Sequence, residues 1–141
     1  MEINWQNQLD NLEGYEGFIY KITNKNTGQS YIGKKSYWSR TSKKIKGLKN
    51  RKRTTKESNW RKYYSSNSTL QEQVKKGNLD DFEFIILRHC KSKREHTYYE
   101  VYYQFQENVL SEKLSNGEYK YLNDNILGKF FRKHLEESLN D

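Results

Sequence analysis

Two short runs of strand-forming residues separated by a turn are the feature that most restricts the fold. Residues 17–23 read GFIYKIT and residues 30–33 read SYIG. Both runs are rich in aromatic and β-branched residues, and the first alternates as half-buried strands do. The intervening residues 24–28 read NKNTG, a composition that favours a turn. The pattern therefore predicts a β-hairpin over residues 17–33.

Further along the chain, strand and helix signals alternate. Residues 81–87 (DFEFIIL) carry the strongest strand pattern. Ser68 begins a capping-box spacing and Gly77 suits the position after a helix end, so a short helix is expected between them. A second helix is expected over about residues 95–110, and Asp124 can cap a last one. The expected apolar face of that last helix consists of Ile126, Leu127, Phe130, Phe131 and Leu135. This order predicts an α+β domain with a small sheet covered by helices.

Positive charge is concentrated in one segment. The net charge is +8 and the pI is about 9.4. Residues 1–16 contain four acids and no Lys or Arg, whereas residues 34–62 are crowded with Lys and Arg and contain one acid, Glu57. Such a patch indicates a polyanionic partner, with solubility as the plainer explanation. The candidate phosphate contacts are Lys34, Lys35, Arg40, Lys43, Lys44, Arg51 and Arg53.

Two segments have weaker structural signals. Trp5, Leu9 and Leu12 are spaced like one face of a short helix, so residues 1–16 are expected to form an N-terminal arm or helix. The basic segment has few apolar residues, and its glycine and asparagine interrupt any helix. A loop with short helical pieces is therefore expected there.

Several classes of protein are excluded by the composition. The single cysteine rules out an internal disulfide and a zinc site of CxxC type. No apolar run is long enough to cross a bilayer, the N-terminus does not resemble a signal peptide, and there is no glycine-rich phosphate loop. We therefore expect a cytoplasmic protein, of a cell or of an infected host, with no membrane partner.

The two predicted hairpin strands each carry a tyrosine that is a candidate for chemistry. Tyr20 and Tyr31 are followed by Gly33, which lets a backbone or ligand approach closely, and by Lys34 and Lys35. Lysines beside tyrosines favour the phenolate and are expected to lower the phenol pKa, which would suit a general base in a phosphate site. The alternative is that both tyrosines serve only for packing.

The residues of this hairpin resemble the paired signature of the GIY-YIG nuclease superfamily. Residues 17–20 (GFIY) resemble the first motif, with the leading Gly displaced by one place, and residues 31–34 (YIGK) resemble the second. Residues 59–66 (NWRKYYSS) resemble a segment of phage-encoded members that places a His or Tyr at the active site, which favours Tyr64. The resemblance extends over about residues 14–126.

The resemblance implies a fold and a metal site. The fold would be a three-stranded sheet, antiparallel or mixed, flanked by helices, with a basic insertion after the second strand. One Mg²⁺ ion, which Mn²⁺ can replace, would bind a helical glutamate. Glu100 falls at that place, and Glu95 and Glu107 are the alternatives. A single carboxylate suffices for Mg²⁺, which keeps several waters.

Two further site residues are implied less directly. A late asparagine near the site corresponds in placement to Asn123 or Asn125. Members of the superfamily also have an arginine on the helix after the second motif, where it contacts the scissile phosphate, and here that helix is replaced or preceded by the basic insertion. Arg61 is favoured for that role and Arg40 is next, with the two arginines at positions 51 and 53 as further candidates.

The predicted helix around Glu100 carries an apolar stripe that faces away from this residue. Such a stripe usually packs on the core, which leaves Glu100 either as a solvated surface residue or as the lining of a cleft that holds DNA. The stripe consists of Tyr98, Val101, Tyr102, Phe105 and Val109.

Together these features predict a Mg²⁺-dependent DNA endonuclease, of the kind that catalyses homing or host DNA breakdown. Tyr20 would be the general base, aided by Tyr31, Tyr64 and Lys34, and a homodimer is one route to specificity. Residues 17–126 would form the nuclease domain with its insertion at 34–62, and residues 127–141 a helix packed on it. The alternatives are a non-catalytic nucleic-acid-binding protein of the same fold and a small basic structural protein.

Overall fold

The computed structural model describes residues 2–44, 46–47, 49 and 52–139, apart from the side chains of Lys43, Lys52, Arg53 and Leu139. No helix in this part of the chain is long and apolar enough to cross a membrane. The predicted arginine contact Arg51 lies outside the described residues, and the side chains of Lys43 and Arg53 lie outside them as well.

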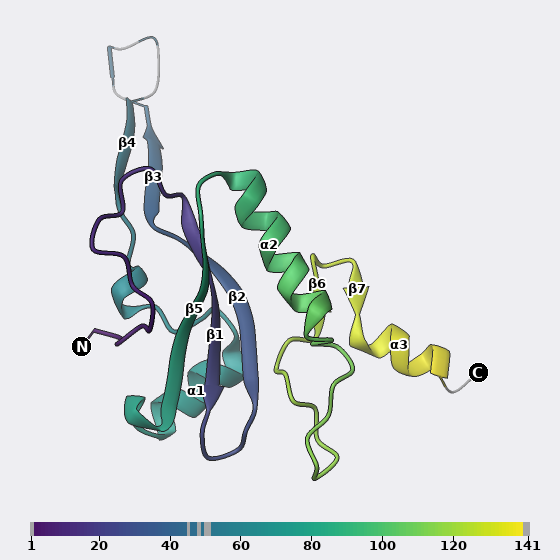
Figure 1. The fold of residues 1–141 in the computed structure, drawn as a ribbon. Helices are drawn as coiled ribbons and strands as arrows, with labels where there is room; N and C mark the ends of the chain where they lie inside the picture. Colours follow the sequence, from purple (N-terminus) through teal and green to yellow (C-terminus); the bar gives the residue numbers. More distant parts are fainter. Residues whose placement is uncertain (1, 45, 48, 50–51, 140–141) are drawn as a thin grey trace.

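A three-stranded antiparallel sheet forms the centre of the molecule (Figure 1). Its strands are β1 (Gly17–Asn24), β2 (Ser30–Ser36) and β5 (Phe82–Cys90), in the order β2-β1-β5. The predicted hairpin is therefore confirmed, and so is the α+β class with a three-stranded sheet. Because β1 is central, its side chains pack on both faces of the sheet.

Helices and short 3₁₀ turns follow the expected order along the chain. The two predicted helices after the hairpin are present, although α2 begins and ends earlier than expected. The elements are η1 (Trp60–Lys62), α1 (Ser68–Lys76), η2 (Leu79–Asp81), α2 (Lys93–Gln106) and α3 (Arg132–Leu139). Asn67 caps α1 by accepting from the Leu70 amide, and Ser92 caps α2 in the same way.

Alternation along β1 divides the core into two layers. Phe18, Tyr20 and Ile22 point to one face, and Ile19 points to the other. The first layer is an aromatic cluster that also contains Trp5, Tyr37, Trp60 and Leu70. The second layer, on the α2 side, contains Ile32, Cys90, Val109, Leu110, Tyr121 and Ile126.

The N-terminal segment is an extended arm, and the helical alternative for it was wrong. Gln6 forms a parallel bridge with Ile85, in which the Gln6 amide donates to the Phe84 carbonyl at 2.8 Å and its carbonyl accepts from Ile86 at 3.0 Å. Trp5 is buried edge-on against Phe18 and Phe84. The arm therefore covers the free edge of β5, which a helix would have left exposed.

The basic segment is a β-hairpin, so the expected loop with helical pieces was wrong. β3 (Trp38–Lys43) pairs antiparallel with β4 (Lys52–Glu57) as a separate two-stranded sheet that rises away from the central one (Figure 1). Its three Thr residues are β-branched and favour extended backbone. The strands carry almost no apolar residues because little of the hairpin is covered, which removed the usual signal from the sequence.

The C-terminal region also differs from the prediction. A small hairpin of β6 (Asn125–Ile126) and β7 (Phe130–Phe131) replaces the expected start of the last helix. Leu127 and Gly128 have φ angles of 60° and 64°, a left-handed conformation that no α-helix continues. The helix begins only at Arg132, whose guanidinium donates to the carbonyls of Val109, Leu110 and Tyr121.

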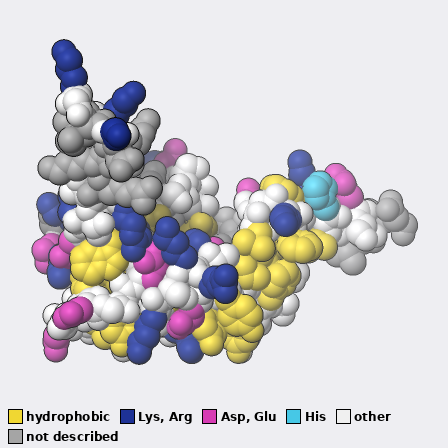
Figure 2. All heavy atoms as spheres, turned by 90° about the horizontal axis from the view of Figure 1, so that it is seen from above, with side chains coloured by type: hydrophobic (Ala, Val, Ile, Leu, Met, Phe, Trp, Pro, Cys, Tyr) yellow, Lys and Arg dark blue, Asp and Glu magenta, His cyan; other side chains and the backbone are white. Residues whose placement is uncertain are grey.

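The three aromatic residues of the predicted apolar stripe face outward, contrary to the prediction that the stripe packs on the core, whereas Val109 is buried in the second layer and Val101 packs against it. Tyr98 is 63% exposed, Phe105 49% and Tyr102 42%. Figure 2 shows hydrophobic side chains gathered on this side, toward the C-terminal region. The opposite face of α2 packs on the sheet because it carries the polar groups that the sheet backbone requires: His96 bonds to the Phe18 carbonyl, and Gln104 donates to the Ile32 carbonyl.

Candidate active site

A cluster of tyrosines lies on the sheet face that packs against η1 and α1. Tyr20 on β1 is paired in register with Gly33 on β2, and its ring lies 6.2 Å from that of Tyr31. A Cβ on Gly33 would lie 2.6 Å from the Tyr20 hydroxyl oxygen and 2.9 Å from the Tyr31 ring. Gly33 is therefore required because the Tyr20 side chain crosses directly over its Cα.

Replacing Gly33 with Ala is expected to displace both tyrosines. Misplacing reactive groups by about 1 Å costs roughly 100-fold in rate, so a reaction at this site should slow by about that factor. Overpacking should also lower the free energy of unfolding by about 1–3 kcal/mol. Gly77→Ala is the control, because the nearest atom to its new Cβ is the flexible Asp81 carboxylate at 3.1 Å. Equal activity of both variants would contradict this role for Gly33.

Tyr63 and Ser65 complete the cluster. Tyr63 and the neighbouring Tyr64 both pack at the border of the aromatic core, and it is Tyr63 that meets Tyr20 edge-on, at 6.1 Å between ring centroids. The structure thus brings Tyr63 to Tyr20, where the sequence favoured Tyr64. The Ser65 side chain hydrogen-bonds to the phenols of Tyr20 and Tyr31.

Ser65 is a site residue that the sequence did not reveal. It is buried and has a φ of 86°, in the left-handed region that costs a non-glycine residue about 1–3 kcal/mol. Its hydroxyl also accepts from the Asn67 amide at 3.0 Å, which ties the cluster to the start of α1. Nothing in a run of polar residues indicates a positive φ, so no sequence signal was present.

Burial controls the ionisation of the tyrosines, and the expectation that nearby lysines lower their pKa was wrong. Burial raises the pKa of Tyr20 well above its ordinary value, and Tyr63 and Tyr31 raise it further. Burial, then the charge of Glu100, raises the pKa of Tyr31 to about 12. The Ser65 hydroxyl has one proton to donate, so its hydrogen bond favours the phenolate of either tyrosine but not of both at once, and it does not outweigh desolvation.

Glu100 lies at the outer edge of β2. The outward-pointing amides of this edge strand need acceptors: Ser30 donates to the Lys120 carbonyl at 2.8 Å and Ile32 to the Asn123 side chain at 3.1 Å. The next such amide, that of Lys34, hydrogen-bonds to Glu100. Glu100 is therefore held by α2 against the strand that carries Tyr31, on the helix face away from the exposed stripe.

The Glu100 carboxylate has a raised pKa because it is partly buried, and the charge and backbone amide of Lys34 oppose that shift. It lines a pocket of about 430 Å³ together with Tyr31 and the start of α1. The remaining lining is polar and rich in oxygen: Ser66, Asn67, Ser68, Gln104, Asn123, Asp124 and Asn125, with Leu127 at one side.

This donor set fits a magnesium ion. Mg²⁺ prefers oxygen ligands, takes one or two carboxylates and keeps several waters. Glu100 and Asp124 are the carboxylates of the pocket, and its volume leaves room for water. The alternatives Glu95 and Glu107 do not line it. No cluster of three or more His, Cys, Asp or Glu suited to a metal occurs among the residues that the structure describes.

Two lysines supply positive charge next to the tyrosines and Glu100. The Lys35 ammonium lies 4.3 Å from the centre of the Tyr63 ring, and burial lowers its pKa. Lys35 follows Tyr31 and Gly33 on the same face of β2. Lys34 points to the α2 face, where its ammonium donates to the Thr97 hydroxyl at 3.0 Å.

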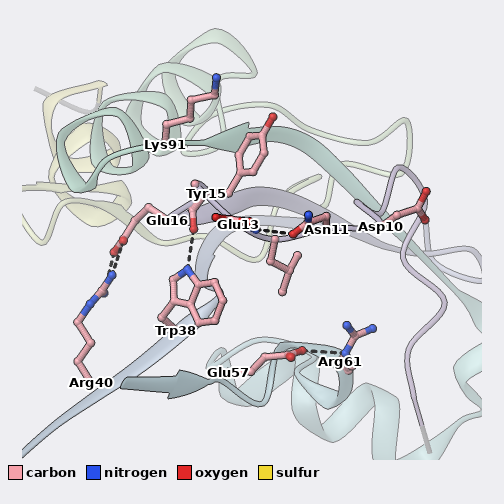
Figure 3. Close-up of a pocket in the computed structure, with 12 residues that line it drawn as sticks. Asp10, Asn11, Glu13, Tyr15, Glu16, Trp38, Arg40, Glu57, Arg61 and Lys91 are labelled. Carbon is pink, nitrogen blue, oxygen red and sulfur yellow. Dashed lines mark hydrogen bonds and ion pairs between the residues drawn. The ribbon is translucent and has the colours of Figure 1, made fainter. Parts of the chain in front are cut away.

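Two of the candidate arginines, Arg40 and Arg61, lie elsewhere. Arg40 and Arg61 line a second pocket of about 630 Å³, beside the N-terminal arm (Figure 3). Arg40 forms a bidentate ion pair with Glu16, and the Arg61 Nε lies 2.8 Å from the Glu57 carboxylate. Neither lines the pocket of Glu100. Lys44 is exposed on the basic segment.

Asn123 is near the site but its amide is used to hold β2. The side-chain oxygen accepts from the Ile32 amide and the side-chain nitrogen donates to the Ile32 carbonyl at 2.8 Å. Asn123 therefore replaces a neighbouring strand at this position of the edge, next to Tyr31. Asn125 also lines the pocket, and its side chain accepts from the Gly128 amide in the small hairpin.

The chain matches one family model, described as "Putative endonuclease segE, GIY-YIG domain", over residues 3–126. The match spans the N-terminal arm, the central sheet, the basic hairpin and both helices that border the site. Searches of curated proteins and of solved structures give no match.

Proposed function

Because the chain belongs to the GIY-YIG nuclease superfamily, we propose that it is an endonuclease that hydrolyses DNA with one Mg²⁺ ion and a tyrosine base. The observation that carries the proposal is the meeting of Tyr31 and Glu100 in one polar pocket, although they come from a strand and a helix about 70 residues apart. A phosphodiesterase needs a base and a metal ligand at one point, and Tyr31 and Glu100 are candidates for these two roles in this pocket.

The general base in this proposal is the pair Tyr20 and Tyr31. Tyr31 lines the pocket and is the member that faces an attacking water, whereas Tyr20 is buried behind it. Ser65 joins the two phenols and favours the form that has lost its proton. A proton taken from water at Tyr31 can thus be shared with Tyr20 through this hydrogen-bonded cluster.

The phosphate would be held by groups that surround the pair. Lys35 lies on the tyrosine face of β2 and would contact a non-bridging oxygen, the role that the sequence assigned to Arg61. The start of α1 lines the pocket and adds the partial positive charge of a helix N-terminus. Mg²⁺ bound to Glu100 would supply positive charge beside the leaving 3′ oxygen. Lys34 favours the ionised form of that glutamate.

The proposal is tested by cleavage of supercoiled plasmid with Mg²⁺ and with EDTA, at low and moderate salt. Nicked or linear product with Mg²⁺ alone is the expected result, and it should decrease at higher salt because phosphate contacts release counterions. A folded protein that binds plasmid and DNA from its own genome but leaves both intact with Mg²⁺ and Mn²⁺ would instead be a non-catalytic binding protein.

A further inference from the structure

The strands β3 (Trp38–Lys43) and β4 (Lys52–Glu57) form a two-stranded ribbon, the β3–β4 ribbon, which is joined to the active-site strand. One residue, Tyr37, separates β2 from β3. Tyr37 is fully buried, and its hydroxyl lies 2.7 Å from the Nδ1 atom of His89 on β5. The direction of the ribbon is therefore set by the same strand that carries Tyr31 and Gly33.

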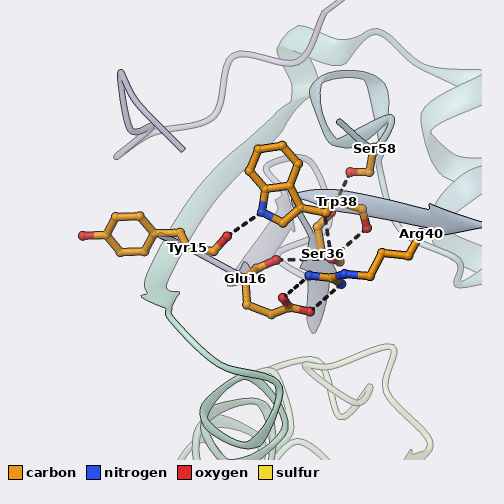
Figure 4. A network of polar contacts seen from close by, with 6 residues as sticks. All are labelled: Tyr15, Glu16, Ser36, Trp38, Arg40 and Ser58. Atoms are coloured by element: carbon orange, nitrogen blue, oxygen red, sulfur yellow. Dashed lines mark hydrogen bonds and ion pairs between the residues drawn. The ribbon is translucent and has the colours of Figure 1, made fainter. Parts of the chain in front are cut away.

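One face of the ribbon is anchored to the body of the protein. The register places Trp38, Arg40 and Thr55 on the same face. The Trp38 indole donates to the Tyr15 carbonyl at 2.6 Å, and Arg40 is held by both oxygens of Glu16 at 3.1 and 2.7 Å (Figure 4). These contacts fix the end of the ribbon nearest β2, and they occupy the face that carries Trp38 and Arg40, here called the anchored face.

The opposite face is polar and available. Ser39 pairs with Lys56, and Thr41 pairs with Thr54, so these four residues share that face. Thr41, Thr54 and Lys56 are exposed. The sequence from residue 38 to residue 57 contains nine Lys or Arg residues and a single acid, Glu57. Figure 2 shows Lys and Arg side chains projecting from this part of the molecule.

We propose that the β3–β4 ribbon enters the major groove of duplex DNA and contacts base edges with Ser39, Thr41, Thr54 and Lys56. This inference rests on the proposed function. A two-stranded ribbon fits the major groove of B-DNA, about 12 Å wide, but not the minor groove of about 6 Å. The deep, narrow major groove of an RNA duplex excludes it. Hydroxyl and ammonium groups are suitable partners for base edges and phosphates.

The ribbon also sets the distance between the contacted bases and the cut. Ten residues separate Tyr31 from Thr41. At about 3.3 Å per residue, an extended chain of this length spans roughly 33 Å. That is about one turn of B-DNA, or roughly 10 base pairs. The ribbon contacts are therefore expected up to one turn from the cleaved bond.

The test is a methylation-interference assay on a DNA fragment that contains a mapped cleavage position. Dimethyl sulfate methylates guanine N7 in the major groove and adenine N3 in the minor groove, so one reagent reports on both. The protein carries Glu100→Gln so that it binds without cutting. Guanine methylation about one turn from the cut should reduce binding, and adenine methylation there should not.

Two variants separate reading by the ribbon from binding in general. Thr41→Val with Thr54→Val removes the hydroxyls but keeps the β-branched shape, and should abolish the distant guanine signal with about a tenfold loss of sequence preference. Thr55→Val lies on the anchored face and is the matched control. It should change neither the distant guanine signal nor the sequence preference. Two results would overturn the ribbon proposal while cleavage stays intact. One is that adenine methylation about one turn from the cut reduces binding. The other is that no methylated base away from the cut reduces binding. Absence of any cleavage would overturn the proposed function instead.

Discussion

Glu100→Gln is expected to lower the rate of DNA cleavage by about 10³-fold while DNA binding is retained. The substitution keeps the shape of the side chain and removes the negative charge that would bind Mg²⁺. A metal ion stabilises a transition state by several kcal/mol, and about 4 kcal/mol corresponds to a factor of 10³. Because the Glu100 carboxylate also accepts from the Lys34 amide, the Gln oxygen should preserve the position of the β2 edge.

The measurements are single-turnover cleavage at several Mg²⁺ concentrations and DNA binding in EDTA. Glu95→Gln provides the matched control, because it lies on the same helix but does not line the pocket. Loss of cleavage in both variants would point to damage of α2 and not to a missing ligand. A Glu100→Gln protein with wild-type cleavage would remove this residue from the proposed mechanism.

The sequence predicted the part of the site that lies within one continuous hairpin, where the pattern of neighbouring residues determines the structure. The hairpin of β1 and β2 is encoded by alternation and a turn, so Tyr20, Tyr31 and Gly33 follow from a few consecutive residues. Their pairing on one face requires only the two-residue period of a strand.

The parts that were missed depend on contacts between distant segments. The N-terminal arm finds its partner at Ile85, which no local pattern of Trp5 and Leu9 reveals. The helical period located the aromatic stripe of α2 correctly but not the direction it faces. That direction is decided by the backbone of β2, which needs Gln104 and Glu100 at its edge.

Consecutive residues of similar chemistry are the second place where the structure differs from what motif spacing suggested. Tyr63 and Tyr64 follow a 3₁₀ turn, and only the extended backbone at Tyr63 determines which ring reaches Tyr20. Likewise Arg61 was expected beside the phosphate because of its neighbours in sequence, yet it is held by Glu57 in another pocket. Motif spacing shows which segment of the chain lies at the site. The backbone conformation of that segment then determines which of its side chains points into the site.

The tyrosine pair predicts a characteristic pH dependence of cleavage. A general base acts in its ionised form, and the pKa of Tyr31 is raised to about 12 by burial and then by Glu100. Between pH 7 and 9 the ionised fraction therefore rises tenfold per pH unit, and the single-turnover rate should rise about tenfold per unit with no plateau. Because the phenol pKa values are raised in the folded protein, ionisation lowers its stability only above about pH 10, outside this range.

Removal of either hydroxyl should then reduce the rate and alter this slope. Tyr31→Phe and Tyr20→Phe are each expected to lower cleavage by about 10²- to 10⁴-fold, the usual contribution of a positioned base. Tyr64→Phe is the control, since Tyr64 does not line the pocket and Tyr63 takes the place beside Tyr20. A wild-type plateau below pH 8, or an unchanged slope in both Phe variants, would show that a different group accepts the proton. Lys35, whose pKa burial lowers, would then be the next candidate, because a neutral amine on the same face of β2 can take that role.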